Sequence, residues 1–301
     1  MASINASTLQ NHTDRSRTRR RAVPVVFLVV LAACSCNSPS RGRAPAQAKL
    51  DEARRLFTAK RDRDAIKAAD EAAAYDPKWP EPHKFKADVL NHSSHFRQAF
   101  EELMVAYRLD PEDVQAALAV LGSPGYAPAA ELEPIARKAV SGAPDNPLTN
   151  YYLGLTLEGC GPSRYAEAME SLQKARQLGP DAILPMIEVG KLSCMVGDET
   201  ASIGALEKAV ARLNEEIKQG DMSPDKLEDW LQLQRSAFFW LSQAYRRKGD
   251  AALADKAAAV AARLSATTAT LRTLKDRAAA RPDDQDTKRR LKSLLETGHS
   301  D

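Results

Sequence analysis

Three histidines that fall close together in the sequence are the first residues to consider for chemistry, because imidazole nitrogens bind metals readily. His92 and His95 are three residues apart in the segment LNHSSHF, and His83 precedes them. The same segment is rich in Asn and Ser, which favour turns because their side chains bond to the nearby backbone. A turn between two helices explains these residues without a ligand, and we therefore predict no metal site.

Patterns that accompany common catalytic centres are missing from the sequence. It contains no His-Glu-x-x-His, no Gly-x-Ser-x-Gly, no glycine-rich phosphate loop and no Cys-x-x-Cys. Each of these patterns places a metal, a nucleophile, a phosphate or a redox pair on a defined turn or helix. We therefore expect that the protein is not an enzyme and that it uses no cofactor.

The elements that position the side chains repeat along the chain. The stretch 65–77 reads AIKAADEAAAYDP, and 34 residues later the stretch 99–111 reads AFEELMVAYRLDP. The second alanine of this pattern recurs at intervals of 34, 33, 36, 34 and 52 residues. Its positions are Ala72, Ala106, Ala139, Ala175, Ala209 and Ala261. A period of this length predicts a solenoid of repeated helix pairs.

A second set of small residues lies in the helix that precedes each of these stretches. Its members are Ala53, Ala87, Gly154, Gly190 and Ser242. Glycine in the middle of a helix costs about 1 kcal/mol relative to alanine. We interpret the two glycines as places where a neighbouring helix comes too close for a larger side chain.

The pattern resembles the tetratricopeptide repeat family, most clearly in Tyr151 to Pro180 and in Phe238 to Leu264. The resemblance implies an all-α fold, a right-handed α-solenoid of stacked antiparallel helix pairs, with about six pairs in residues 46–264. It also implies a concave side, formed by the first helices of the pairs, that faces a ligand. The remainder, 265–301, is expected to hold an extension of the last helix and a short capping helix.

Three departures from the repeat carry predictions of their own. The third pair has a short first helix, Val114 to Leu121, because the following GSPGYAP breaks any helix. An excess of eighteen residues before the sixth pair predicts two lengthened helices, with Ser223 as the cap of the second. Leucine spacing after Leu253 predicts one helix that continues to about Ala280.

Family resemblance also indicates which side chains face the ligand. The implied set is Lys84, Asp88, Asn91, Tyr151, Leu155, Glu158, Ile187, Lys191, Phe239, Gln243 and Arg246. Tyr151, Leu155 and Ile187 would form an apolar strip that accepts an amphipathic helix or an extended peptide. The alternative is that these three are ordinary core residues at helical spacing.

The N-terminal segment 1–33 differs from the rest. Five arginines precede an eleven-residue apolar run, Val23 to Ala33, which is too short to cross a bilayer and typical of a signal peptide. The run ends in Leu-Ala-Ala-Cys, which resembles the lipobox of bacterial lipoproteins. That resemblance implies acylation of Cys34, with residues 34–45 as a flexible tether. Two or more acyl chains hold a protein firmly on a bilayer.

Location follows from the same resemblance. The protein is expected to face the periplasm from a lipid anchor, and Ser35 after the cysteine favours the outer over the inner membrane. Without the five arginines and one aspartate of the signal peptide, 38 basic and 39 acidic residues remain. A nearly neutral chain does not favour nucleic acid as a partner, because a basic stripe would be expected.

Two further cysteines, Cys160 and Cys194, fall in neighbouring repeats. Two independent thiols are the simpler expectation. A disulfide between them is the alternative, since an oxidising compartment would permit it.

Together these features predict a membrane-anchored scaffold that mediates protein–protein interaction in the bacterial cell envelope and binds another protein or a peptide segment. The alternative function is an accessory subunit that binds cell-wall or exported polysaccharide. A groove lined by several aromatic residues would favour sugar, whereas mixed charge with an aliphatic strip favours peptide.

Overall fold

The computed structural model describes residues 42–123, 125–219 and 223–297. Within these ranges the chain forms thirteen α-helices and one short 3₁₀ turn, and it contains no strand. The expected signal peptide and Cys34 lie outside the described residues.

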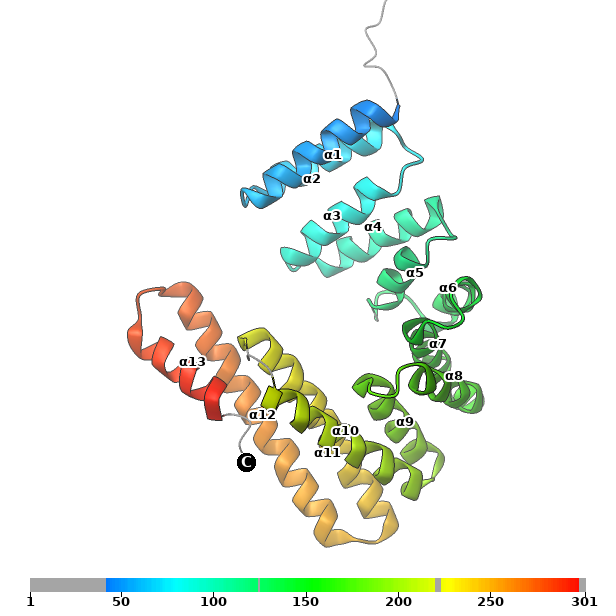
Figure 1. The fold of residues 1–301 in the computed structure, drawn as a ribbon, viewed down its shortest axis with the longest axis vertical. Coiled ribbons are helices and arrows are strands. Elements are labelled where there is room, and N and C mark those ends of the chain that lie inside the picture. The colour runs from blue at the N-terminus through cyan, green and yellow to red at the C-terminus, as the bar shows by residue number, and fades with distance from the viewer. Residues whose placement is uncertain (1–41, 124, 220–222, 298–301) are drawn as a thin grey trace, which may run out of the picture. The chain divides into compact units, whose positions relative to one another are not determined.

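Successive helices form hairpins (Figure 1). The bounds are α1 Arg43–Thr58, α2 Asp62–Tyr75, α3 Glu81–His92, α4 Phe96–Leu109, α5 Val114–Leu121, α6 Ala129–Gly142, α7 Pro147–Gly159, η1 Pro162–Arg164, α8 Tyr165–Leu178, α9 Ile183–Val196, α10 Glu199–Gln219, α11 Pro224–Lys248, α12 Ala251–Ala280 and α13 Gln285–Thr297. Each α-helix packs on the next along the chain, and several first helices also pack on the first helix of the following hairpin, as α9 does on α11. The predicted all-α solenoid of stacked helix pairs is confirmed.

Small residues allow the two helices of a hairpin to approach closely. A Cβ atom built on Gly154 of α7 would lie 2.6 Å from Cγ of Leu172 on α8. A Cβ on Gly190 of α9 would likewise overlap the side chain of Leu206 on α10. The interpretation of both glycines as points of close helix approach is therefore confirmed.

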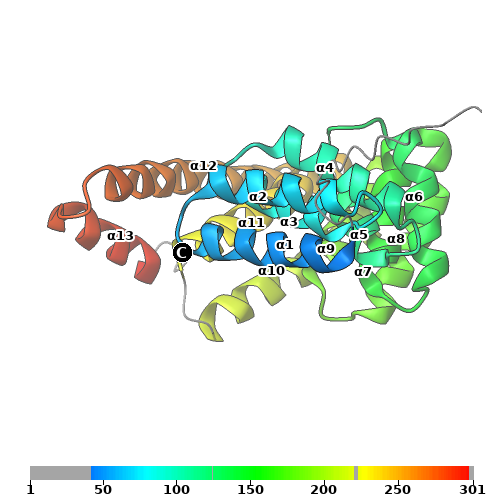
Figure 2. The same ribbon diagram turned by 90° about the horizontal axis from the view of Figure 1, so that it is seen from above.

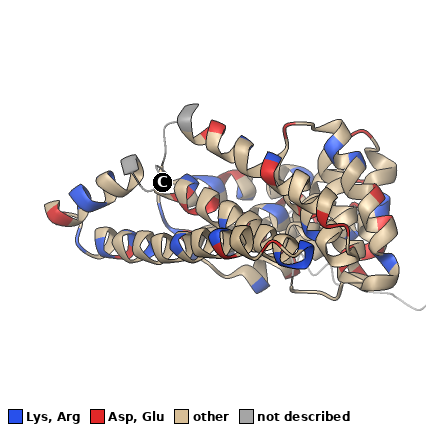
Figure 3. Cartoon of the chain, turned by 90° about the horizontal axis from the view of Figure 1, so that it is seen from below, with Lys and Arg blue, Asp and Glu red and all other residues tan. Residues whose placement is uncertain are grey.

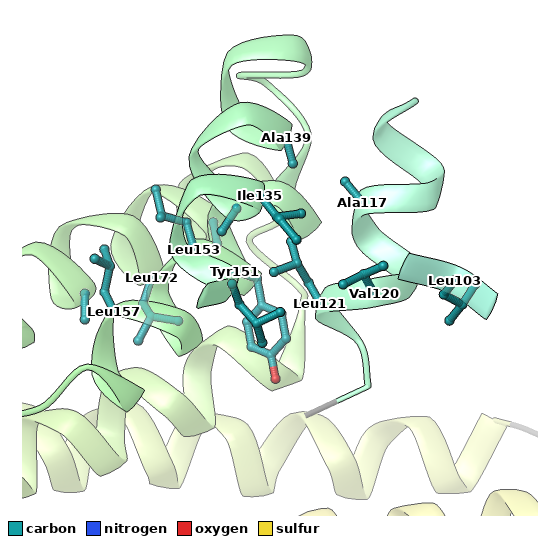
Figure 4. Close-up of a cluster of buried hydrophobic side chains, with 14 of the residues drawn as sticks. Leu103, Ala117, Val120, Leu121, Ile135, Ala139, Tyr151, Leu153, Leu157 and Leu172 are labelled. Atoms are coloured by element: carbon teal, nitrogen blue, oxygen red, sulfur yellow. The ribbon is translucent and has the colours of Figure 1, made fainter. Parts of the chain in front are cut away.

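Hydrophobic side chains from several hairpins share common cores. Figure 4 shows part of the core of the middle hairpins, where Val120 and Leu121 of α5 lie near Ile135 of α6 and Tyr151 of α7. A second core joins α9 to α12, and the leucines of α13 pack against it. Burying apolar area contributes about 25 cal/mol per Å². Because each hairpin contributes to a core that it shares with its neighbours, its stability depends on them.

The lengthened α10 and α11 bracket the insertion before the sixth pair. Ser223 Oγ accepts a hydrogen bond from the Lys226 backbone N–H and caps α11 as predicted. The indole N–H of Trp230 donates to the Leu213 carbonyl over 2.7 Å, and both residues are buried. The bond from Trp230 to Leu213 joins the two long helices, which Figure 2 shows from a second direction.

The first helix begins earlier than predicted. Residues 43–45, assigned to the flexible tether, form the first turn of α1. Pro45 is compatible with this position because the N–H groups of the first turn have no partner within the helix. Arg43 stabilises this first turn, since its guanidinium pairs with Asp76 at 2.8 Å and lies 4.4 Å from the ring centroid of Trp79.

Among the described helices, none combines the length and the apolar character that a bilayer crossing requires.

Candidate interaction surfaces

The first helices α3, α7, α9 and α11 carry the predicted ligand-facing residues, and they expose them unequally. Tyr151 and Ile187 are buried. Lys84, Leu155, Glu158, Lys191 and Gln243 are partly buried, and Asp88, Asn91, Phe239 and Arg246 are exposed. We call the side of the solenoid formed by these helices the first-helix face.

The predicted apolar strip is not open. Tyr151 is 7% exposed and its ring packs edge-on against Tyr152 with centroids 5.2 Å apart. Ile187 is 2% exposed within the core that joins α9 to α12. Burial, together with Glu188, raises the pKa of the Tyr151 hydroxyl. These two residues stabilise the fold, and only Leu155 of the three is partly accessible.

Other apolar side chains on the same helices are exposed instead. Leu148 precedes Tyr151 by three residues and is 48% exposed, and Leu184 precedes Ile187 by three residues and is 41% exposed. Side chains three apart share one side of a helix. Phe239 on α11 is 48% exposed and packs edge-on against Trp240. The sequence analysis missed both leucines, although their identical offset in two repeats was a usable signal.

A cluster of charged groups joins α7 to α9. The Lys191 ammonium lies 2.8 Å from a Glu158 carboxylate oxygen and also contacts Glu188. Burial raises the pKa of the Glu188 carboxyl. Burial alone would lower the pKa of Lys191, but Glu188 and Glu158 raise it. Two carboxylates therefore share one cation inside the first-helix face. The sequence analysis missed Glu188, whose three-residue spacing to Lys191 signals the pair.

Lys84 joins two hairpins. Its ammonium contacts the carboxylate of Asp113, which caps α5 by accepting a 2.8 Å hydrogen bond from the Gln115 backbone N–H. Lys84 also pairs with Glu81 at 3.2 Å. This lysine is consequently part of the joint between α3 and α5 rather than an uncommitted ligand-binding group.

Comparison with solved structures identifies the architecture. PilW, described as a widely conserved type IV pilus biogenesis factor, matches with 14% identity over 84% of this chain and 100% of its own, with a TM-score of 0.50. The MamA RS-1 ArsTM double mutant matches with 18% identity over 57% of this chain and 97% of its own, with a TM-score of 0.51. The fold is that of a tetratricopeptide-repeat solenoid.

A further match is residues 41 to the end of MamA from Desulfovibrio magneticus RS-1, at 19% identity over 56% of this chain and 95% of its own, with a TM-score of 0.49. No protein-family model matches the sequence, and neither does any curated protein. At these identities, PilW and the MamA RS-1 ArsTM double mutant indicate a shared fold and nothing finer.

The three histidines of the solenoid have separate neighbours. His83 Nδ1 lies 2.7 Å from a Glu102 carboxylate oxygen, and His92 packs against Phe57 at 5.3 Å between ring centroids. His95 lies at the start of α4. Within the described ranges, no three His, Cys, Asp or Glu side chains gather as a metal would require.

Both described cysteines are free thiols, so the disulfide considered as an alternative is not formed. Cys160 Sγ lies 3.8 Å from a Glu133 carboxylate oxygen, and partial burial with that carboxylate raises the pKa of the thiol. Cys194 is buried beside the Arg247 guanidinium, 3.9 Å from Sγ. Each thiol thus has its own environment.

Two grooves are lined by successive second helices together with the first helix between them, and repeat spacing alone does not predict them. The α8–α10 groove, of about 430 Å³, includes Arg176, Val196, Gly204 and Lys208 in its lining. The α10–α12 groove, of about 470 Å³, is mainly apolar, and its lining includes Phe238, Leu241, Leu253 and Val260. Opposite charges are interspersed over the helices (Figure 3).

Proposed function

We propose that this repeat solenoid is a lipid-anchored scaffold of the bacterial cell envelope that binds a segment of another protein along its first-helix face. We choose this surface on one observation: apolar side chains are exposed at the same repeat position on neighbouring first helices. Leu148 and Leu184 occupy the same place in consecutive repeats, and Phe239 adds an aromatic side chain on α11. Burial of apolar surface is the main favourable contribution to most protein–protein association.

The chemistry of this face supports a protein partner over a polysaccharide. Two of its exposed apolar side chains are aliphatic, whereas sugars are usually bound against several flat aromatic rings. The Lys191 cluster and Arg246 add charges of both signs, which suit the mixed side chains of a peptide. A chain without recognisable catalytic patterns supports a binding role rather than an enzymatic one.

The anchor is the second part of the proposal. It rests on the signal-like segment 1–33 and on Cys34 at its end, which together predict an acylated N-terminus facing the periplasm, with the outer membrane favoured. PilW, a pilus biogenesis factor, shares the fold. By analogy, we extend the proposal to assistance in envelope assembly.

A Cys34→Ser variant tests the anchor. We expect the wild type to incorporate labelled palmitate and to fractionate with membranes, and the variant to lose both properties. A variant that stays in the membrane fraction with its label unchanged would refute lipidation at this residue.

Partner capture tests the surface. The variant Leu148→Ala/Leu184→Ala/Phe239→Ala removes the exposed apolar groups of the first-helix face. Its matched control is Phe96→Ala, since Phe96 on the second helix α4 is 51% exposed. After cross-linking in cells, we expect the triple variant to lose proteins that the wild type and the control both retain. Identical sets from all three proteins would exclude this face.

A further inference from the structure

The α8–α10 groove carries two cations without counter-ions. Arg176 of α8 and Lys208 of α10 both line it, and neither makes a hydrogen bond or an ion pair with any residue in the described part of the chain. The remaining charged residue of the lining is Asp198, whose carboxylate accepts a 2.9 Å hydrogen bond from the Ala201 backbone N–H at the start of α10. The groove therefore presents positive charge that the solenoid itself does not neutralise.

Apolar side chains line the groove together with these cations. Of the apolar residues that line the groove, Val196 is 54% exposed, Met169 is partly buried and Val189 is buried. A smaller adjoining cavity of about 190 Å³ shares Arg176 and Lys208 and adds Met186 and Pro180. The two cations thus belong to both cavities, and each cavity contributes its own apolar side chains.

Gly204 leaves the groove open. A Cβ built on this residue of α10 would meet no atom within 4 Å, although Gly190 and Gly154 are tightly packed. Alanine at position 204 would be favoured by helix propensity, so close packing does not require glycine here. The missing side chain leaves additional space beside Lys208.

We propose that the α8–α10 groove binds an acidic, amphipathic segment of a partner protein, with a carboxylate between Arg176 and Lys208 and apolar side chains on either side of it. An apolar helix face in a groove with complementary charge is a recurrent mode of peptide recognition. A nucleic acid would need a longer basic stripe than two residues. Val189, Ser193 and Val196 of the first helix α9 also line the groove, but its lining includes none of the proposed first-helix contacts Leu148, Leu184 and Phe239.

The probe is a phage library of random 16-residue peptides, panned against the purified protein. We expect enrichment of sequences in which Asp or Glu is flanked by Leu, Ile, Val, Phe or Met. The most enriched sequence is then synthesised with a fluorescent label, and binding is measured by anisotropy. Replacing its acidic residue by the amide should weaken binding by about tenfold or more, and added salt should weaken it further.

Two variants locate the site. Gly204→Leu adds a side chain to the groove at a position where the new Cβ has no neighbour within 4 Å, and Arg176→Glu/Lys208→Glu reverses its charge. We expect each to weaken binding of the synthetic peptide by about tenfold or more while the melting temperature stays within a few degrees of wild type. The matched control is Lys174→Glu, an exposed residue of α8 outside the lining, which should bind as wild type does.

Three results would overturn the inference: no enriched peptide, an enriched sequence without acidic residues, or binding that survives both groove variants. The Leu148→Ala/Leu184→Ala/Phe239→Ala variant separates the two proposals. It should bind the synthetic peptide normally, so failure of the first-helix face leaves this test unaffected.

Discussion

Gly190 of α9 faces Leu206 of α10 so closely that a β-carbon at position 190 would overlap the leucine side chain. The neighbouring repeat has the same relationship between Gly154 and Leu172. Each glycine costs its helix about 1 kcal/mol of propensity relative to alanine, and the close contact of the two helices offsets that cost.

The first prediction follows from this contact. Gly190→Leu should lower the free energy of unfolding by roughly 1–3 kcal/mol, because the added side chain overpacks a filled interface. Thermal unfolding followed by circular dichroism measures the loss. Gly204→Leu is the matched control, since it places the same side chain on α10 at a position where the added Cβ has no neighbour within 4 Å. Equal melting temperatures for the two variants would mean that α9 and α10 do not meet here.

The second prediction uses the open glycine alone. Gly204→Ala should raise the free energy of unfolding by roughly 0.5–1 kcal/mol, because alanine loses less conformational freedom in a helix and meets nothing within 4 Å. Urea unfolding of the two proteins checks the sign. A loss of stability would show that the position is less open than its geometry indicates.

The third prediction concerns pH. Burial raises the pKa of Glu188, so this carboxyl holds its proton more tightly in the folded than in the unfolded protein. Its contribution to stability is therefore present below the unfolded pKa and is lost as the pH rises through the raised folded pKa. Glu188→Gln removes this dependence. Relative to wild type, the variant should gain stability in urea titrations as the pH rises above the ordinary carboxyl pKa, and a constant difference would contradict the shift.

The fourth prediction tests the joint between the long helices. Trp230→Phe should lower the free energy of unfolding by roughly 0.5–1.5 kcal/mol, because the hydrogen bond from the indole to the Leu213 carbonyl is lost inside the core. Trp240→Phe serves as the control, since that indole makes no hydrogen bond to any described residue. Chemical denaturation compares them, and equal losses would assign the effect to ring size rather than to the hydrogen bond.

The repeat period predicted most of the fold. It located the helix pairs because each pair must present the same small and apolar positions to its neighbours, and it identified Gly154 and Gly190 as sites of close packing. The proposed role of Tyr151 and Ile187 as an open strip was wrong for a physical reason. Helical spacing shows which side of a helix a residue occupies, but not how deeply the next helix covers it.

The repeat pattern did not predict the α8–α10 and α10–α12 grooves. The volume of the α8–α10 groove depends on the distance between α8 and α10, which is set by packing against α9 rather than by any local sequence feature. Single residues in the sequence were nevertheless informative. Gly204 is a glycine without a packing partner. Arg176 and Lys208 are cations with no carboxylate three or four residues away on the same helix. These sequence features indicate a groove only once the position of the neighbouring helix is known.

The early start of α1 limits the distance between the first hairpin and a bilayer. If Cys34 carries the acyl chains, nine peptide steps connect it to Arg43, which is fixed to Asp76 and Trp79. A fully stretched chain of that length spans about 30 Å. The first hairpin would then begin within about 30 Å of the lipid headgroups.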